Sequence, residues 1–197
     1  MTGKISITQY DAPEFFSFSA DNAEKAKEII ARYPAGRQQS AVMPLLTMAQ
    51  KQSGGWLPQV AMDYVANMLG MAPVRVYEVA SFYTMYNLKP TGKHVIEICT
   101  TTPCWLRGSD AIVAACENHL GIGLGETTAD GQFTLREVEC LGACVNAPMC
   151  AVGEHFYEDL TPENVLGILD TLAAGKKPKP GPQSGRMSSE PGEKKTT

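Results

Sequence analysis

The placement of the cysteines constrains the fold of this chain more than any other feature. The sequence has six cysteines in 197 residues, and none of them lies in the first 98. Four form two close pairs, Cys99-x4-Cys104 and Cys140-x3-Cys144, and each pair follows a segment that alternates like a β-strand. If these strands are parallel neighbours, their carboxyl ends meet and place four thiols on two facing loops. The sequence therefore predicts a four-thiol site that a sheet assembles.

The part of the chain before the cysteines has the periodicity of short helices. Apolar residues recur three and four positions apart in several stretches, which predicts a small helical bundle over residues 1–90. The expected helix boundaries are an Asp21-x-x-Glu24 capping box and Pro34 for the first helix, Ser40 and Gly54-Gly55 for the second, and Gly70 for the third. A fourth helix is expected around residues 76–83.

The pattern changes after residue 90 and becomes that of an α/β domain. Two strands are expected at residues 93–99 and 133–139, with a helix at 105–120 between them. A hairpin is expected at residues 149–158, before a last helix that Thr161 caps. This order predicts a compact α/β unit over residues 91–174, about as large as a thioredoxin domain.

The segment from residue 175 to residue 197 differs from the rest in composition. It has six Lys and Arg against two Glu, four Pro, four Gly and a single large apolar residue, Met187. The segment therefore has a net charge of +4. The rest of the chain has a net charge of −8, which gives −4 for the whole chain. Such a segment buries too little apolar surface to offset its ordering entropy, so it is predicted to be disordered. An arm that docks on an acidic partner is the alternative.

Three kinds of site use four cysteines in this arrangement. Disulfide bonds are rare in reducing compartments, and the sequence shows no secretory signal. Structural zinc prefers C-x2-C, because two intervening residues let both sulfurs face one tetrahedral ion, and the present spacings are looser. A [2Fe-2S] cluster needs two thiolates at each of two irons, and therefore two ligand loops. The pattern favours the cluster, with zinc and disulfides left as alternatives.

The other two cysteines and the histidines are expected to be structural. Cys116 lies on the apolar stripe of a predicted helix, where a free cysteine behaves as a small hydrophobe. Cys150 lies in a predicted strand six positions after Cys144, and its use in place of Cys144 is left open. The histidines are scattered singly, without the paired spacing of a Rieske or zinc site, at His94, His119 and His155.

Several classes of function are disfavoured. The net charge of −4, with Arg75 as the only basic residue between positions 55 and 85, argues against a helix-turn-helix DNA-binding domain. No apolar run approaches the roughly 18 residues of a membrane helix. The glycines at 121, 123 and 125 follow a predicted helix instead of opening one, so they indicate a turn and not a dinucleotide-binding loop. The first 16 residues lack the apolar core of a secretory signal, and they carry Asp11 and Glu14, unlike an organelle transit peptide, which is poor in acidic residues. A reducing compartment, most simply a bacterial cytoplasm, is therefore expected.

Two motifs resemble one known family closely. Residues 99–109, CTTTPCWLRGS, and residues 139–148, ECLGACVNAP, resemble the thioredoxin-like [2Fe-2S] subunit of respiratory complex I. Shorter stretches at residues 77–86, 125–128 and 130–135 are also similar to that family. The resemblance covers roughly residues 20–174 and leaves out the basic C-terminal segment.

The resemblance implies a thioredoxin-like ferredoxin domain of the α/β class behind an N-terminal helical bundle. It implies one [2Fe-2S] cluster per chain, held by four cysteine ligands, Cys99, Cys104, Cys140 and Cys144. It further implies that the chain sits beside a flavoprotein subunit with FMN, a [4Fe-4S] cluster and the NADH site, and has no substrate site of its own. As a subunit of NADH:quinone oxidoreductase it would lie on the cytoplasmic face of the membrane, or in the matrix of an organelle.

Two other functions are left open. The equivalent subunit of a soluble NAD-linked hydrogenase or formate dehydrogenase would have a similar sequence. A protein of another class, an assembly scaffold with a structural metal, would need the same four thiols.

Overall fold

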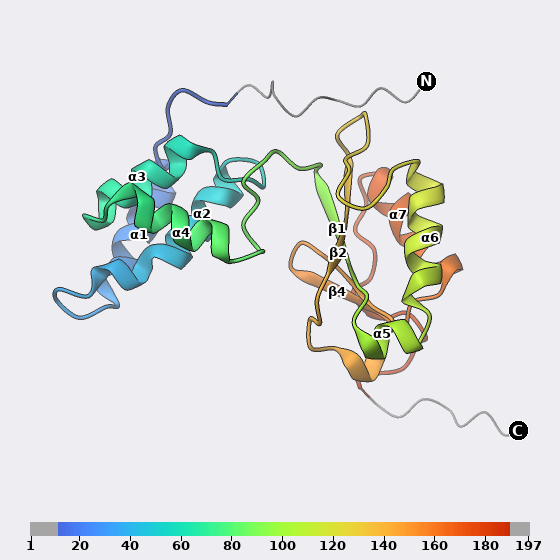
Figure 1. Ribbon diagram of the computed structural model, residues 1–197. Coiled ribbons are helices and arrows are strands. Elements are labelled where there is room, and N and C mark those ends of the chain that lie inside the picture. The colour runs from blue at the N-terminus through green and yellow to red at the C-terminus, as the bar shows by residue number, and fades with distance from the viewer. Residues whose placement is uncertain (1–11, 190–197) are drawn as a thin grey trace, which may run out of the picture. The chain divides into compact units, whose positions relative to one another are not determined.

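The computed structural model describes residues 12–189, which fall into two compact units that meet at Pro90 and Thr91 in the sequence. The first unit is helical and the second combines a sheet with helices (Figure 1). The expectations drawn from residues 1–11 and from residues 190–197 lie outside the described residues.

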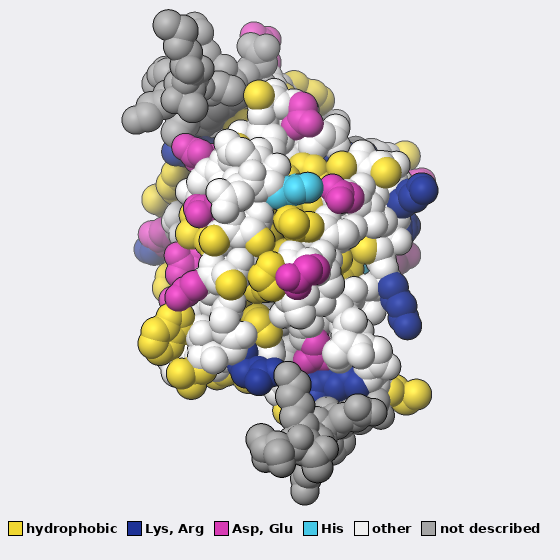
Figure 2. Space-filling model, turned by 90° about the vertical axis from the view of Figure 1, so that its right-hand side faces the viewer, with side chains coloured by type: hydrophobic (Ala, Val, Ile, Leu, Met, Phe, Trp, Pro, Cys, Tyr) yellow, Lys and Arg dark blue, Asp and Glu magenta, His cyan; other side chains and the backbone are white. Residues whose placement is uncertain are grey.

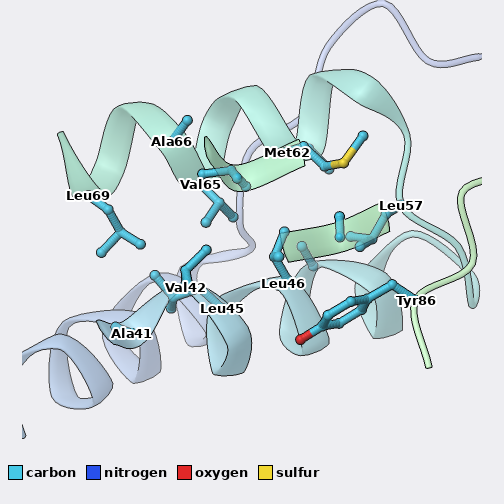
Figure 3. Packing of buried hydrophobic residues seen from close by; sticks show 14 of the residues in the cluster. Ala41, Val42, Leu45, Leu46, Leu57, Met62, Val65, Ala66, Leu69 and Tyr86 are labelled. Carbon is cyan, nitrogen blue, oxygen red and sulfur yellow. The ribbon is translucent and has the colours of Figure 1, made fainter. Parts of the chain in front are cut away.

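The first unit is the expected helical bundle. Its elements are α1 (Ala20–Ala31), the 3₁₀ helix η1 (Gln38–Ala41), α2 (Val42–Gln52), α3 (Gln59–Leu69) and α4 (Pro73–Phe82). Leu45 and Leu46 of α2 and Val65 of α3 point into the space between these helices, where all three are fully buried (Figure 3). Burial of such a stripe stabilises short helices that would be marginal alone in water. Gly70 ends α3 in a left-handed conformation, as predicted.

Two helix starts differ from their predictions. The N-cap of α1 is Ser19, whose hydroxyl accepts a hydrogen bond from the Asn22 amide at 3.3 Å, so the predicted capping box at Asp21 is wrong. Ser40 lies inside η1 and caps nothing, because η1 runs directly into α2. The Val42 amide there donates to a backbone carbonyl of η1, which takes the place of a side-chain cap.

The second unit is built on a mixed sheet. Within residues 91–189 the strand order is β2-β1-β3-β4-β5. The strands are β1 (His94–Cys99), β2 (Phe133–Val138), β3 (Cys150–Val152), β4 (His155–Glu158) and β5 (Gly181–Pro182), and the helices are α5 (Thr102–Leu106), α6 (Ser109–Leu120), η2 (Cys144–Asn146) and α7 (Pro162–Ala173). β1 pairs in parallel with β2 and antiparallel with β3, and β3 and β4 form the predicted hairpin. Thr161 caps α7 as expected, through a reciprocal pair of hydrogen bonds with Asn164.

The core of this unit lies between the sheet and two helices. α6 and α7 pack against each other on the same side of the sheet (Figure 1). Ile98 of β1, Ile112 of α6 and Leu169 of α7 belong to one buried cluster. Figure 2 looks onto this side of the molecule, where acidic side chains are scattered among hydrophobic ones and most basic side chains lie toward the edges. Among residues 12–189, no helix has both the length and the apolar composition that crossing a membrane requires.

The helix predicted at residues 105–120 is interrupted. Gly108 has a φ of +93°, a left-handed conformation that ends α5 and lets the chain turn into α6. Because α5 already begins at Thr102, Cys104 lies within a helical turn instead of preceding a helix. Periodicity alone misses the break, since both helices keep apolar residues at helical spacing.

The prediction of disorder from residue 175 is wrong for the part of that segment that the structure describes. β5 adds to the sheet edge in parallel with β4. The Arg186 guanidinium makes a bidentate ion pair with Asp159, with Nε at 2.7 Å from Oδ2. Strand pairing and a bidentate ion pair can hold this segment in place although it has few apolar side chains. Composition alone does not reveal such contacts.

We expect His94, the first residue of β1, to make the stability of the fold depend on pH. Its ring packs on Phe133, and its buried Nε2 has no hydrogen-bond partner among the described residues. Burial, assisted by the charge of Lys93, lowers the pKa of His94 below 6.5. The unfolded chain therefore binds this proton more tightly than the folded chain, so stability falls as the pH drops below 6.5.

Replacing His94 with phenylalanine removes this titration. Between pH 7.5 and pH 5, the wild-type chain is expected to lose more of its free energy of unfolding than His94→Phe, as measured by urea denaturation. Between pH 7.5 and pH 9, where His94 is neutral in both states, the difference between the two proteins should stay constant. Parallel curves over the whole range would contradict the assignment.

Candidate metal centre

The first cysteine pair is buried where β1 passes into α5. Cys99 is the last residue of β1 and Cys104 is the third residue of α5, and each is 1% exposed. Their thiols are close enough for Cys99 to raise the pKa of Cys104. The hydroxyl of Thr101 lies 3.2 Å from the Cys99 sulfur. The turn between β1 and α5 thus brings two thiols and one hydroxyl close together.

The second pair lies on an exposed loop after β2. The sulfurs of Cys140 and Cys144 are 3.2 Å apart, and the Gly142 amide donates to the Cys140 sulfur at 3.4 Å. Gly142 has a φ of +88°, so a side chain at this position would strain the loop that turns its amide toward the sulfur. Both cysteines are exposed, in contrast to the first pair.

The parallel pairing of β1 and β2 brings the two pairs together. Cys99 lies opposite Val138 in the register, so the chain leaves both strands at the same end of the sheet. The Cys140 thiol interacts with both Cys144 and Cys99, and Cys99 interacts in turn with Cys104. Cys144 also interacts with Cys99 and Cys104, so the four thiols lie near one another. Within residues 12–189, no three His, Cys, Asp or Glu side chains converge on one point as ligands of a single metal ion.

The two loops differ in electrostatics. Burial raises the pKa of the Cys104 thiol to about 12, and the neighbouring Cys99 adds to this, against a hydrogen bond from the Met149 backbone. In contrast, the hydrogen bond from the Gly142 amide, followed by that from Cys144, lowers the pKa of Cys140. A thiol must lose its proton to bind a metal. Only Cys140 is favoured for this step, because the hydrogen bond with Cys140 raises the pKa of its loop neighbour Cys144, as burial does for Cys104.

Polar and apolar side chains surround the thiols. An open pocket beside the first pair is lined by three threonines, a tryptophan and two acidic residues, Thr100, Thr101, Thr102, Trp105, Glu137 and Glu139. Thr100 donates to the Glu137 carboxylate at 2.5 Å. Leu106 is 71% exposed and Val145 is 67% exposed, each within two residues of a site cysteine in the sequence.

The residues set apart from the site are structural, as expected. Cys116 and Cys150 are fully buried in the core between sheet and helices, where burial raises the pKa of both thiols. The His119 ring lies 2.9 Å from the Asp170 carboxylate and links α6 to α7. Gly121 is the left-handed C-cap of α6, which confirms a turn where a dinucleotide loop was the alternative.

Sequence reasoning missed two contributors to the site. The Met149 backbone and the segment around Arg186 both reach the cysteine loops. Each lies about 40 residues along the chain from the residue that it contacts, Cys104 or Val145, and leaves no local signal.

Comparison with known proteins agrees with this geometry. Residues 26–173 match the family of the thioredoxin-like [2Fe-2S] ferredoxin. The chain is 52% identical over 182 residues to NADH dehydrogenase [ubiquinone] flavoprotein 2 of Dictyostelium discoideum, covering 92% of this chain and 74% of that protein. It is 57% identical over 157 residues to a subunit of the NADH-quinone oxidoreductase of Rickettsia conorii, covering 80% of this chain and 94% of that protein.

A solved structure shares the fold. The crystal structure of an NAD+-reducing [NiFe]-hydrogenase superposes with a TM-score of 0.58 and 19% identity, covering 66% of this chain and 23% of that chain. At this identity the similarity concerns the architecture only. From the family match and the close relatives, we conclude that the chain belongs to the thioredoxin-like [2Fe-2S] ferredoxin family.

Proposed function

We propose that the chain is the one-electron carrier subunit of an NADH dehydrogenase module of the complex I type, with a [2Fe-2S] cluster held by Cys99, Cys104, Cys140 and Cys144. The observation that carries this proposal is the meeting of four thiols, two from each of two loops, at one end of the sheet.

The donor set fits this cluster. Two irons bridged by sulfide need two thiolates each, and four neighbouring thiols from two loops supply them. A single zinc ion needs four ligands around one point, for which the present grouping is less suited. When bound, such a cluster accepts and returns one electron at a time.

The chain's own groups prepare the site for a negatively charged cluster. The Gly142 amide donates toward sulfur, and the Thr101 hydroxyl lies beside Cys99. Hydrogen bonds of this kind to ligand sulfurs tune the reduction potential of iron–sulfur sites. Burial of Cys99 and Cys104 keeps one side of the site dry, while Cys140 and Cys144 keep the other side at the surface. An electron donor can therefore approach the exposed loop.

The partner is the flavoprotein subunit that binds FMN and NADH. The close relatives are named as parts of NADH dehydrogenases, and no dinucleotide loop was found at Gly121–Gly125. The exposed Leu106 and Val145 beside the thiols suit a surface that packs against such a subunit. Within the assembled complex, the chain would lie peripherally on the cytoplasmic face of the membrane, or on the matrix face in a mitochondrion.

The equivalent subunit of a soluble NAD-linked hydrogenase is the second candidate. The superposition on an NAD+-reducing hydrogenase favours it, but only at the level of the fold. The relatives named as parts of NADH dehydrogenases are 52% and 57% identical to this chain, against 19% for the hydrogenase. The complex I role is therefore the better supported one.

The proposal is tested by purifying the full chain without oxygen, alone and together with its neighbouring gene products. About two irons and two sulfides per chain are expected, with one unpaired electron in the low-temperature spin spectrum after reduction. Zinc without iron would instead indicate a structural metal in a scaffold protein. Co-purification with an FMN-containing NADH dehydrogenase subunit is expected, whereas a nickel-containing partner would favour the hydrogenase role.

A further inference from the structure

The C-terminal strap, residues 181–189, reaches the exposed cysteine loop. It begins as β5 on the edge of the sheet, where the Gln183 amide donates to the Glu158 carbonyl at 2.9 Å. The described chain then ends near η2 and α5, at the cysteine end of the unit (Figure 1). The strap thus connects the far edge of the sheet to the loop that carries Cys144.

The strap holds the two residues that follow Cys144. Arg186 Nη2 donates to the Val145 carbonyl at 3.0 Å, and the Asn146 side-chain amide donates to the Ser188 carbonyl at 2.9 Å. These hydrogen bonds reach η2, a single turn of three residues. Val145 itself is exposed, so it adds little packing to keep this turn in place.

Asp159, directly after β4, makes hydrogen bonds to both the strap and the cysteine loop. Its carboxylate accepts two bonds from Arg186 and one from Ser184 at 2.7 Å, and its amide donates to the Asn146 carbonyl at 2.8 Å. Burial alone would raise the pKa of Asp159, but the bonds from Arg186 and Ser184, with the charges of Arg186 and Arg107, hold it below its usual range. The Arg186 and Asp159 side chains are only 17% and 12% exposed, so water competes little for this pair.

We propose that Arg186 and Asp159 are positioning residues for the metal centre, and that the strap they anchor keeps Cys144 in the geometry that retains the cluster. This inference rests on the proposed function, because it takes Cys144 as a ligand. Leu141 and Ala143 of the exposed loop pack against the buried cluster of the site, and the Asn146 side chain also donates to the Glu158 carboxylate. Cys140 and Cys144 themselves lie outside that cluster, so the position of Cys144 depends on the backbone around it, which the strap holds on one side. Groups that orient metal ligands through hydrogen bonds typically change metal retention by about 10- to 100-fold when they are removed.

The test compares the loaded full-length chain with Arg186→Gln. The variant is expected to lose its visible cluster absorption about tenfold faster in excess chelator, and its reduced spin spectrum is expected to shift. Arg186→Lys keeps the charge but not the two-pronged geometry, so it should release iron at an intermediate rate. The matched control is Arg75→Gln, which breaks an exposed ion pair with Glu78 in the helical unit and should release iron at the wild-type rate.

A second variant keeps the inference testable if Arg186→Gln does not fold. Ending the chain after Gln183 removes Ser184, Arg186 and Ser188 but leaves β5, and it should accelerate iron release to the same extent. Release at the wild-type rate from this variant or from Arg186→Gln would overturn the inference. That result is distinct from failure of the proposed function, in which the wild-type chain itself would hold no two-iron cluster.

Discussion

Cys140→Ala is expected to abolish the cluster. With the proposed ligand set, one of the two irons would lack a ligand without this thiol, and the Gly142 amide would lose the sulfur to which it donates. Iron and visible absorption of the anaerobically purified chain should fall to less than about a tenth of the wild-type values. Iron and sulfide analysis, together with the reduced spin spectrum, measures the loss.

Cys116→Ala is the matched control for this experiment. It removes a thiol of the same chain, but one that is fully buried on α6 and belongs to the core. The variant should lose some stability and yet keep both irons, because its thiol is not one of the four at the site. Full iron content in Cys140→Ala would show that the ligand set is wrong.

Leu169→Ala should cause a large loss of stability in the second unit. Leu169 is 1% exposed on α7, in the cluster that joins this helix to α6 and the sheet. Removing a buried leucine side chain costs its transfer free energy and leaves a cavity, together about 2–5 kcal/mol. Amide hydrogen exchange of β1 reports opening of this unit by itself, so protection there should fall by the corresponding factor.

Leu106→Ala provides the comparison for Leu169→Ala. The same atoms are removed at a side chain that is 71% exposed, so the free energy of unfolding should change by no more than about 0.5 kcal/mol. Equal losses of protection in the two variants would mean that α7 does not close the core as described.

Local sequence patterns were sufficient for most of the elements. The helix that Gly70 ends, the capping of α7 by Thr161 and the hairpin of β3 and β4 were predicted correctly, because each depends on neighbouring residues. The predicted helix cap at Ser40 and the predicted continuous helix across Gly108 were wrong, because backbone conformation decided both places and the side-chain pattern did not show it. A 3₁₀ turn made a cap unnecessary at the first, and a left-handed glycine divided one apparent helix at the second.

The strap was the largest disagreement between composition and structure. The Lys, Pro and Gly content of residues 175–197, which include the strap, argued for disorder, and this argument considers only how much apolar surface a segment can bury. Residues 181–189 are ordered by other means, namely strand pairing with β4 and the ion pair between Arg186 and Asp159. In each of these contacts the two partners are far apart in the sequence, so a short stretch of sequence does not contain both and cannot predict the contact.

The sequence by itself determined the chemistry of this protein, because the types and spacings of Cys99, Cys104, Cys140 and Cys144 are local properties that already favour an iron–sulfur site over its alternatives. Only the tertiary structure decided how that chemistry is held. The parallel register of β1 and β2 joins the two cysteine loops, and the return of the chain to Asp159 steadies one of them. Such contacts depend on backbone pairing and charge across long stretches of sequence, which residue patterns along the chain do not encode locally.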